Sequence, residues 1–513
     1  MDNIERLYKC YEILSESLDN VQKNEEEYKE ILEAVKGSTK EKMLATQFIG
    51  KFFKYFPDLA NKAIDAQLDL CEDEDIQIRR QAIKNLPLFC KDTKEHTPRI
   101  GDTLSQLLVL DDPLELQQVH FALQTILKTD AKGALAGMFG QIASGDEVTR
   151  EKTFKFLSTK VFNLGSTVVT KEIEEFIISE IKRLLQDVTS EEFQLCMNIL
   201  RCTKLGSTVT GHVELVNLAV EQAELGADID AITIEDEVVE RFIQCASQAM
   251  PYFSTQIPST PFIIFVCDKL LPLSTWNMIA PTEQGQTQLR LLKVFAEMCT
   301  YTGTLENASE RIEAVYKILR EYMPLPVLDE IEILKNPPSF QFSHAECLLY
   351  ALHSLGKKHP DKLNFISDPD SLKDFRSRLQ FLARGTQGYI KKLEEAVKGK
   401  SKEELKSEED QLKLTALKTT SNINALIRDL FHTPPSFKTE VQLSWVVPRK
   451  TKFGQKRHAE ITFDSKKKNS PDKKPKAGEQ KVYVPPSGKY SAKVQNYSNR
   501  NRGFRQQRPK NKF

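Results

Sequence analysis

The chain has 513 residues, 40% of them hydrophobic, and 72 lysines and arginines balance 72 aspartates and glutamates. It is too long and too apolar to be wholly disordered, so a large folded core is expected. The charge is uneven: residues 448–513 hold 20 basic and 4 acidic residues, whereas the first 447 hold 52 and 68. An acidic body joined to a basic tail excludes a uniformly basic nucleic-acid-binding domain, an acidic disordered chain and a collagen-like repeat.

The N-terminus and the most apolar segment carry no targeting or membrane signal. Residues 1–6 lack the basic-then-apolar order of a signal peptide, and the apolar run 262–267 is followed at once by two charged residues. The nine cysteines include no CxxC pair. We therefore expect no membrane partner and a soluble nuclear or cytosolic protein with reduced core thiols.

From Ile4 to about Phe431, apolar residues recur at the i, i+3, i+4 and i+7 spacing of amphipathic helices, and strand signals are nearly absent. A small residue followed four positions later by a large aliphatic one recurs within this region. The pairs are Ala45 and Ile49, Ala82 and Leu86, Ala122 and Ile126, and Thr153 and Leu157. Their offsets of 37, 40 and 31 residues are close to the helix-pair repeat of HEAT and armadillo arrays. The pattern predicts an all-α, right-handed solenoid of about ten helix pairs.

Beyond residue 205 the periodicity loosens, and residues 206–211, 226–236 and 334–342 are predicted to be longer loops. The last strong helical pattern runs from Glu408 to Phe431. From residue 448 onward there is no leucine, and lysine, asparagine, serine and glycine dominate. This tail cannot bury a core and is expected to be disordered.

Several segments of the chain resemble one known family. They are residues 37–49, 66–75, 78–84, 322–326, 346–350 and 485–490. Together they are similar to the apoptosis inhibitor 5 (antiapoptosis clone 11) family along essentially the whole chain. The resemblance implies HEAT-like repeats in 1–205, armadillo-like repeats in 206–447 and a basic tail in 448–513. It also implies a nuclear scaffold that opposes apoptosis, with Acinus and basic fibroblast growth factor as partners.

Leu104, Leu107 and Leu108 form an LxxLL box, which the family is described as carrying. The three leucines of such a helical box can fill a groove on a partner such as a nuclear receptor. In a stacked helix pair the same leucines are core residues. We predict that they are buried.

Leu372, Leu379 and Leu393 follow a seven-residue spacing that matches the zipper-like segment of the family, but Thr386 occupies the third position. Two neighbouring glycines weaken the helix further, so we predict that these leucines pack between solenoid helices and form no free coiled coil. The link to Acinus that the resemblance implies would then use the surrounding helical surface.

The tail carries lysine clusters at the place of the family's nuclear localisation signal. Its residues are Lys456, Arg457, Lys466, Lys467, Lys468, Lys473, Lys474 and Lys476. Adjacent lysines in a flexible segment suit the acidic pockets of an import receptor, which predicts a nuclear location, with the cytoplasm as a second location. Arginines interleave with Tyr497 and Phe504 farther along, so RNA binding through the tail stays open.

Glu147, Asp187, Glu191 and Glu192 resemble the acidic patch through which the family engages the basic growth factor. Gln186 departs from that pattern, because relatives carry an acid there. Solvated acids without a partner are the simpler interpretation of this patch.

No enzyme signature is complete. Residues 399–401 resemble the end of a P-loop, but Glu394 occupies the position of the upstream glycine, and HExxH and GxSxG motifs are absent. We predict no catalysis and no cofactor. The predicted function is an antiapoptotic nuclear scaffold whose surface binds protein partners and restrains apoptotic DNA fragmentation. A nuclear RNA-associated adaptor is the alternative, and an import-receptor role, suggested by the fold alone, is a third.

Overall fold

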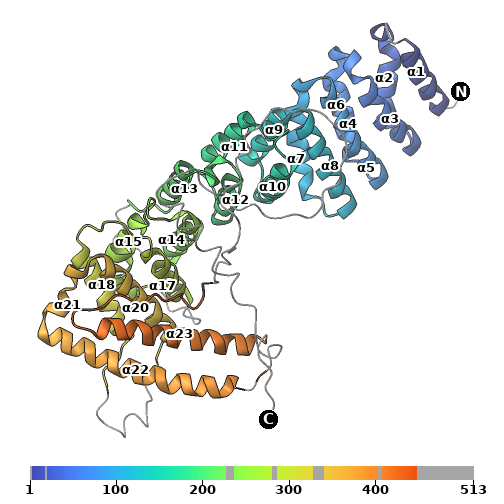
Figure 1. The fold of residues 1–513 in the computed structure, drawn as a ribbon. Coiled ribbons are helices and arrows are strands. Elements are labelled where there is room, and N and C mark those ends of the chain that lie inside the picture. The colour runs from blue at the N-terminus through green and yellow to red at the C-terminus, as the bar shows by residue number, and fades with distance from the viewer. Residues whose placement is uncertain are drawn as a thin grey trace, which may run out of the picture. The chain divides into compact units, whose positions relative to one another are not determined.

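The computed structural model describes residues 3–17, 20–226, 236–279, 286–326, 340–398, 400 and 407–446. The chain divides into two compact units, Met1–Pro448 and Arg449–Phe513, and the second lies outside the described residues. Within the described residues all regular structure is helical, so the prediction of an all-α solenoid is confirmed (Figure 1).

The helices of the first half are α1 (Asn3–Glu16), α2 (Glu25–Glu33), α3 (Thr39–Phe52), α4 (Ala60–Cys71), α5 (Ile76–Asn85), α6 (Leu88–Lys91), α7 (Thr97–Gln106), α8 (Pro113–Thr129), α9 (Ala131–Ser144), α10 (Glu147–Phe156), α11 (Lys171–Leu184) and α12 (Ser190–Arg201). Those of the second half are α13 (Val209–Gln222), α14 (Asp236–Ala249), α15 (Thr260–Phe265), α16 (Leu273–Trp276), α17 (Gln286–Cys299), α18 (Ala308–Glu321), α20 (Phe342–Lys358), α21 (Asn364–Ser367), α22 (Pro369–Val397) and α23 (Glu408–Phe431). Short 3-10 and π turns extend several of them.

Consecutive helices pack as pairs. The pairs are α2 with α3, α4 with α5, α7 with α8, α9 with α10, α11 with α12, α13 with α14, α15 with α17, α18 with α20, and α22 with α23 (Figure 1). The second helices also contact one another in chain order, from α3 through α5 to α8 and from α10 through α12, α14, α17 and α20 to α23. We call these second helices the second-helix row.

Aspartates start three helices of this row. Asp75, Asp112 and Asp146 are the N-cap residues of α5, α8 and α10, and each side chain accepts hydrogen bonds from backbone N–H groups of the first turn. Thr189 does the same for α12. Local capping chemistry therefore sets the start of each second helix in this region.

The small and large residues of the repeat form the contact surface of the same row. All eight lie on α3, α5, α8 and α10 or on the turns that continue them, and all are buried. Small side chains allow the helices to approach closely. The nine cysteines are all free thiols, and only Cys202 is exposed.

Glycines permit an even closer approach between α7 and α9. A Cβ atom added to Gly137 would lie 2.0 Å from the carbonyl oxygen of Pro98, and one added to Gly101 would lie 2.8 Å from that of Ala134. The backbones of these two helices therefore meet directly, with no side chain between them.

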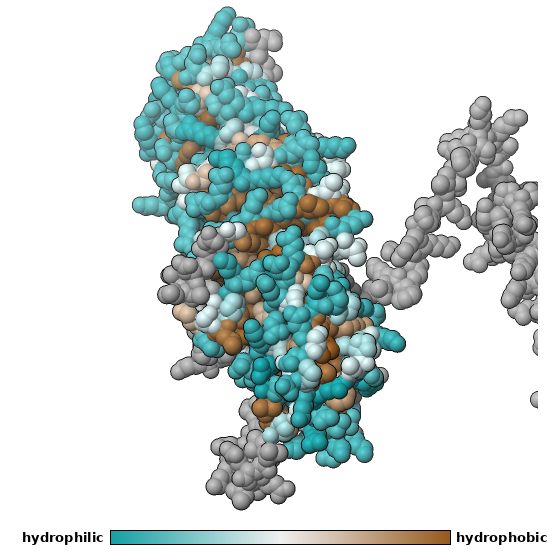
Figure 2. All heavy atoms as spheres, turned by 90° about the vertical axis from the view of Figure 1, so that its left-hand side faces the viewer, coloured by the Kyte–Doolittle hydropathy of each residue, from teal (hydrophilic) through white to brown (hydrophobic). Residues whose placement is uncertain are grey.

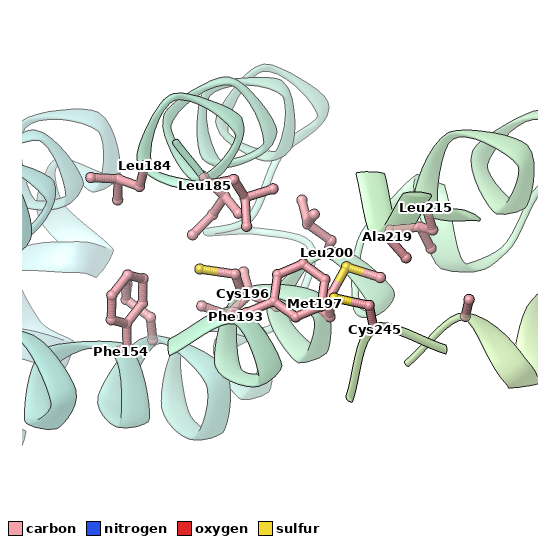
Figure 3. Packing of buried hydrophobic residues seen from close by; sticks show 14 of the residues in the cluster. Phe154, Leu184, Leu185, Phe193, Cys196, Met197, Leu200, Leu215, Ala219 and Cys245 are labelled. Carbon is pink, nitrogen blue, oxygen red and sulfur yellow. The ribbon is translucent and has the colours of Figure 1, made fainter. Parts of the chain in front are cut away.

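The core continues without a break across residue 205. Phe154 of α10, Phe193 and Met197 of α12, Leu215 of α13 and Cys245 of α14 lie in one buried cluster (Figure 3). The division into HEAT-like and armadillo-like halves at this residue stays a prediction. Outside the core, the face in Figure 2 is mostly hydrophilic, with hydrophobic residues gathered in patches near mid-height.

After α23, residues 432–446 form a segment that we call the C-terminal strap. Its Ser444 donates backbone and side-chain hydrogen bonds to the buried carboxylate of Glu346, at 3.0 and 2.7 Å. Trp445 Nε1 donates to Glu297 Oε1 at 2.6 Å. The strap is therefore fixed to α17 and α20 just before the basic tail begins.

Candidate protein-binding surface

The predicted acidic patch lies where α10, the α11–α12 turn and α12 meet, and Arg150 joins all three. Its Nη1 donates to the Ile142 carbonyl at 2.7 Å, and its Nη2 donates to the Asp187 carbonyl at 3.0 Å. Its Nε and Nη2 donate to the two carboxylate oxygens of Glu192 at 2.8 and 3.1 Å. One guanidinium therefore fixes the turn that carries Asp187 against the N-terminal half of α10.

Glu192 is buried and does not belong to the exposed acidic surface, which corrects its place in the patch predicted from the sequence. Its side chain is 6% exposed, and besides the bonds from Arg150 it accepts a hydrogen bond from the backbone N–H of Thr189, completing a capping box for α12. Burial alone would raise the pKa of Glu192, but the hydrogen bonds from Arg150 and Thr189 outweigh it and hold that pKa below its ordinary value. Both carboxylate oxygens of Glu192 are therefore hydrogen-bonded inside the protein and are not available to a partner.

An earlier repeat contains the same arrangement, which explains why Glu192 is structural. Arg79, four residues after the N-cap of α5, donates from Nε to Glu115 Oε1 at 2.7 Å. Glu115 is the third residue of α8, as Glu192 is the third residue of α12. A bidentate arginine–glutamate pair thus links one second helix to the next in both places.

Glu147, Asp187 and Glu191 remain as exposed acids on this surface. None of the three forms an ion pair with another residue that the structure describes. Asp146 is exposed beside them, and its hydrogen bond from the Thr149 N–H holds its pKa below the ordinary value. The sequence analysis did not include Asp146 in the patch, although an N-cap aspartate keeps its charge at the surface. The patch is therefore Asp146, Glu147, Asp187 and Glu191.

The LxxLL box spans the end of α7 and the 3-10 turn that follows. Leu104 and Leu108 are buried, whereas Leu107 is half-buried and packs against the core. The two buried leucines are not available to a partner groove in this conformation.

The predicted leucine heptad lies on α22, which runs unbroken through both of its glycines. Leu379 and Leu393 are buried, Leu372 is half-buried, and α22 packs along its own neighbour α23. Thr386, at the position that breaks the heptad, is buried and donates a hydrogen bond to Asn424 Oδ1 of α23 at 2.7 Å. The threonine is therefore a specific polar contact between the two helices.

The predicted nuclear localisation residues and the arginine-rich end of the tail lie outside the described residues. Of the P-loop-like triplet only Lys400 is described, and its Nζ is 2.6 Å from Asp410 Oδ1. In the part of the chain that the structure covers, no group of three or more histidine, cysteine, aspartate or glutamate side chains is arranged to hold a metal ion. No described helix is long and apolar enough to span a membrane.

Comparison with known proteins identifies the family. The model of the family described as Apoptosis inhibitory protein 5 (API5) matches residues 4–512. The chain belongs to this family. It is 65% identical over 510 residues to the apoptosis inhibitor 5 homolog of Drosophila melanogaster, covering 97% of this chain and 95% of the relative. It is 47% identical to human apoptosis inhibitor 5, covering 98% and 96%.

A more distant relative, the apoptosis inhibitor 5-like protein of Oryza sativa, is 31% identical over 90% of this chain and 89% of its own length. The match to the family includes the basic tail as well as the helical body. Membership supports an antiapoptotic role, and the family is one of apoptosis inhibitors and not a known enzyme family.

Proposed function

We propose that this chain is a nuclear scaffold that opposes apoptosis by binding protein partners on its helical-repeat surface and so restrains apoptotic DNA fragmentation. One observation carries the proposal: Arg150 fixes the turn that carries Asp187 beside Glu147 and Glu191, and none of these three exposed acids forms an ion pair with a described residue. A rigid, preorganised acidic surface favours a basic protein partner over small ligands.

The mechanism that we propose is occlusion. The helices that carry the patch are packed on both sides, so the acids keep their spacing when a partner arrives. A partner held there would have its activating or protease-sensitive segment covered. No chemical step is required of the scaffold.

Basic fibroblast growth factor, the basic partner that the resemblance suggests, is the probe for this surface. Replacing Glu147, Asp187 and Glu191 together by lysine should slow association and weaken binding in surface plasmon resonance, and the wild-type affinity should fall steeply with salt. A matched variant, in which the exposed Asp58, Asp69 and Glu72 become lysine, should bind like wild type. Equal binding by the two variants, at all salt concentrations, would remove the acidic patch from the proposal.

An Acinus-like partner would contact the exposed side of α22 and α23, because the heptad leucines face inward. The lysine clusters of the tail would supply nuclear entry through an import receptor. Replacing the six lysines between 466 and 476 by alanine should move a tagged protein from nucleus to cytoplasm. Persistent nuclear accumulation would place the signal elsewhere.

A nuclear RNA-associated adaptor is the second candidate function. It is favoured by the tail sequence, where Arg500, Arg502, Arg505 and Arg508 interleave with an aromatic residue at Phe504. Crosslinking to RNA, compared between the full chain and a chain lacking residues 499–513, separates the two functions. RNA crosslinks that vanish with the deletion would support the adaptor.

A further inference from the structure

A hollow lies on the second-helix row, apart from the acidic patch. It is a groove of about 540 Å³ across α3, α5 and α8. Its apolar contacts are Met43, Leu114 and Phe121, and the last two side chains are 53% and 59% exposed. Leu114 and Phe121 are seven residues apart on α8, which places them roughly 10 Å apart along the helix axis. Two exposed large apolar side chains at one hollow offer a partner apolar area to bury.

Four glutamine side chains line the same groove: Gln77 and Gln81 from α5, and Gln117 and Gln118 from α8. None of these side-chain amides makes a hydrogen bond with another described residue. Each amide offers both donors and an acceptor. An extended peptide presents free backbone N–H and C=O groups to such amides, whereas a helix has already paired its own. The groove therefore suits a peptide in an extended conformation.

The charges in the groove are cationic, although the surrounding body is acidic. Arg80 and Lys84 line it, and no aspartate or glutamate does. Arg80 is held in place by an ion pair from its Nη2 to Asp112 Oδ1 at 2.9 Å. Lys84 is exposed and pairs with no described acid, in a region that carries 68 acidic and 52 basic residues. This local reversal of sign favours an acidic ligand.

We propose that this groove binds an extended acidic segment of a partner protein, with apolar side chains against Leu114 and Phe121 and a carboxylate near Lys84. The basic tail of this chain does not fit, because its charge has the same sign as the groove. A nucleic acid fits poorly, since phosphate recognition uses several free cations and the described groove offers one. The inference goes beyond the proposed function, whose patch takes basic partners.

The test selects ligands from a random twelve-residue peptide library displayed on phage, using the immobilised full chain. Counter-selection on a full chain with Phe121→Ser and Lys84→Glu removes peptides that bind the basic tail. We expect the enriched peptides to combine aspartate or glutamate with leucine or an aromatic residue. Measured by fluorescence anisotropy, each single substitution should weaken their binding at least about tenfold.

Matched control variants are Val209→Ser, at an exposed valine on α13, and Lys128→Glu, at an exposed lysine on α8 outside the groove. Both should bind the selected peptides like wild type. No enrichment, basic peptides, or peptides indifferent to Phe121→Ser would overturn the proposal. So would a dimer of the full chain that Phe121→Ser dissociates, or binding of polyuridylic acid that Lys84→Glu abolishes, because the groove would then serve a second copy or RNA.

Discussion

Replacing Glu192 by alanine removes the acceptor of two guanidinium hydrogen bonds and of one capping hydrogen bond in a single change. The hydrogen bond that Glu192 accepts from the Thr189 N–H contributes about 1 kcal/mol, and leaving one partner of a buried ion pair unpaired costs about 3 kcal/mol or more. Arg150 keeps its bonds to the carbonyls of Ile142 and Asp187, which offsets part of that cost. We expect a loss of about 3 kcal/mol.

Urea unfolding followed by circular dichroism tests this value. Hydrogen exchange of α10 and α12 adds a local measurement, because a repeat array need not unfold as one unit. Glu191→Ala is the control: one residue earlier and exposed, it should leave stability within about 0.5 kcal/mol and weaken binding of the basic growth factor instead. Wild-type stability of Glu192→Ala would refute the reasoning.

The stability of the protein should depend on pH through Glu192, and the sign of this dependence is fixed. The pKa of Glu192 lies below its ordinary value, so its ion pair contributes fully above that ordinary value, near pH 4.3, and the contribution is lost as the pH falls through the folded pKa. Wild type should therefore lose stability more steeply toward low pH than Glu192→Ala does. Parallel acid limbs would show that this carboxylate is not paired in the folded state.

Three further changes probe the packing. Gly137→Ala would push a methyl group into the Pro98 carbonyl and should lower the free energy of unfolding by about 2 kcal/mol, measured by thermal unfolding. An unchanged melting temperature would contradict the close contact of α7 and α9. Leu104→Arg should lower the free energy of unfolding by about 3 kcal/mol or more, because the side chain of Leu104 is fully buried. A variant that folds normally and only loses a partner would show that the LxxLL box is an exposed ligand. Asp429 of α23 accepts hydrogen bonds from His353 and from the backbone N–H of Thr439 in the C-terminal strap. Asp429→Asn removes this charged acceptor and should make the amide hydrogens of the strap exchange faster by a factor of about ten or more. Unchanged exchange would refute that role.

The strap has its own acid sensitivity. Burial alone would raise the pKa of Asp429, but hydrogen bonds from Thr439, His353 and Ser436 outweigh it and hold that pKa far below its ordinary value. Burial lowers the pKa of His353, so protonating it is also unfavourable in the folded state. Both groups therefore bind protons less readily when folded, and both stabilise the strap at neutral pH and lose that contribution as the pH falls.

The periodicity of the sequence predicted the helical repeat and the last helix, Glu408–Phe431, to the residue, because core spacing and capping residues are local signals. The spacing of the small residues predicted the helix-pair repeat for the same reason. The sequence pattern did not distinguish the exposed Glu191 from the buried Glu192. The two differ only in which side of α12 each faces, and that depends on Arg150, 42 residues earlier.

Long-range contacts explain the other differences. The sequence analysis treated the two glycines of α22 as weak points, but Gly385 lies where a Cβ would be 2.6 Å from the ring of Phe340, so it permits a packing contact. The groove on α3, α5 and α8 was missed altogether. Its glutamines and lysine come from helices that are neighbours only after the pairs stack, and no single helix shows the combination.

The most direct test of the antiapoptotic scaffold measures DNA fragmentation in cells that lack the endogenous protein and express variants at equal levels. One variant has Glu147, Asp187 and Glu191 replaced by lysine, and cells that express it should fragment their DNA after an apoptotic stimulus as cells without the protein do. The control variant, with Asp58, Asp69 and Glu72 replaced by lysine, should protect cells like wild type. Full protection by the first variant, folded and nuclear, would contradict the account.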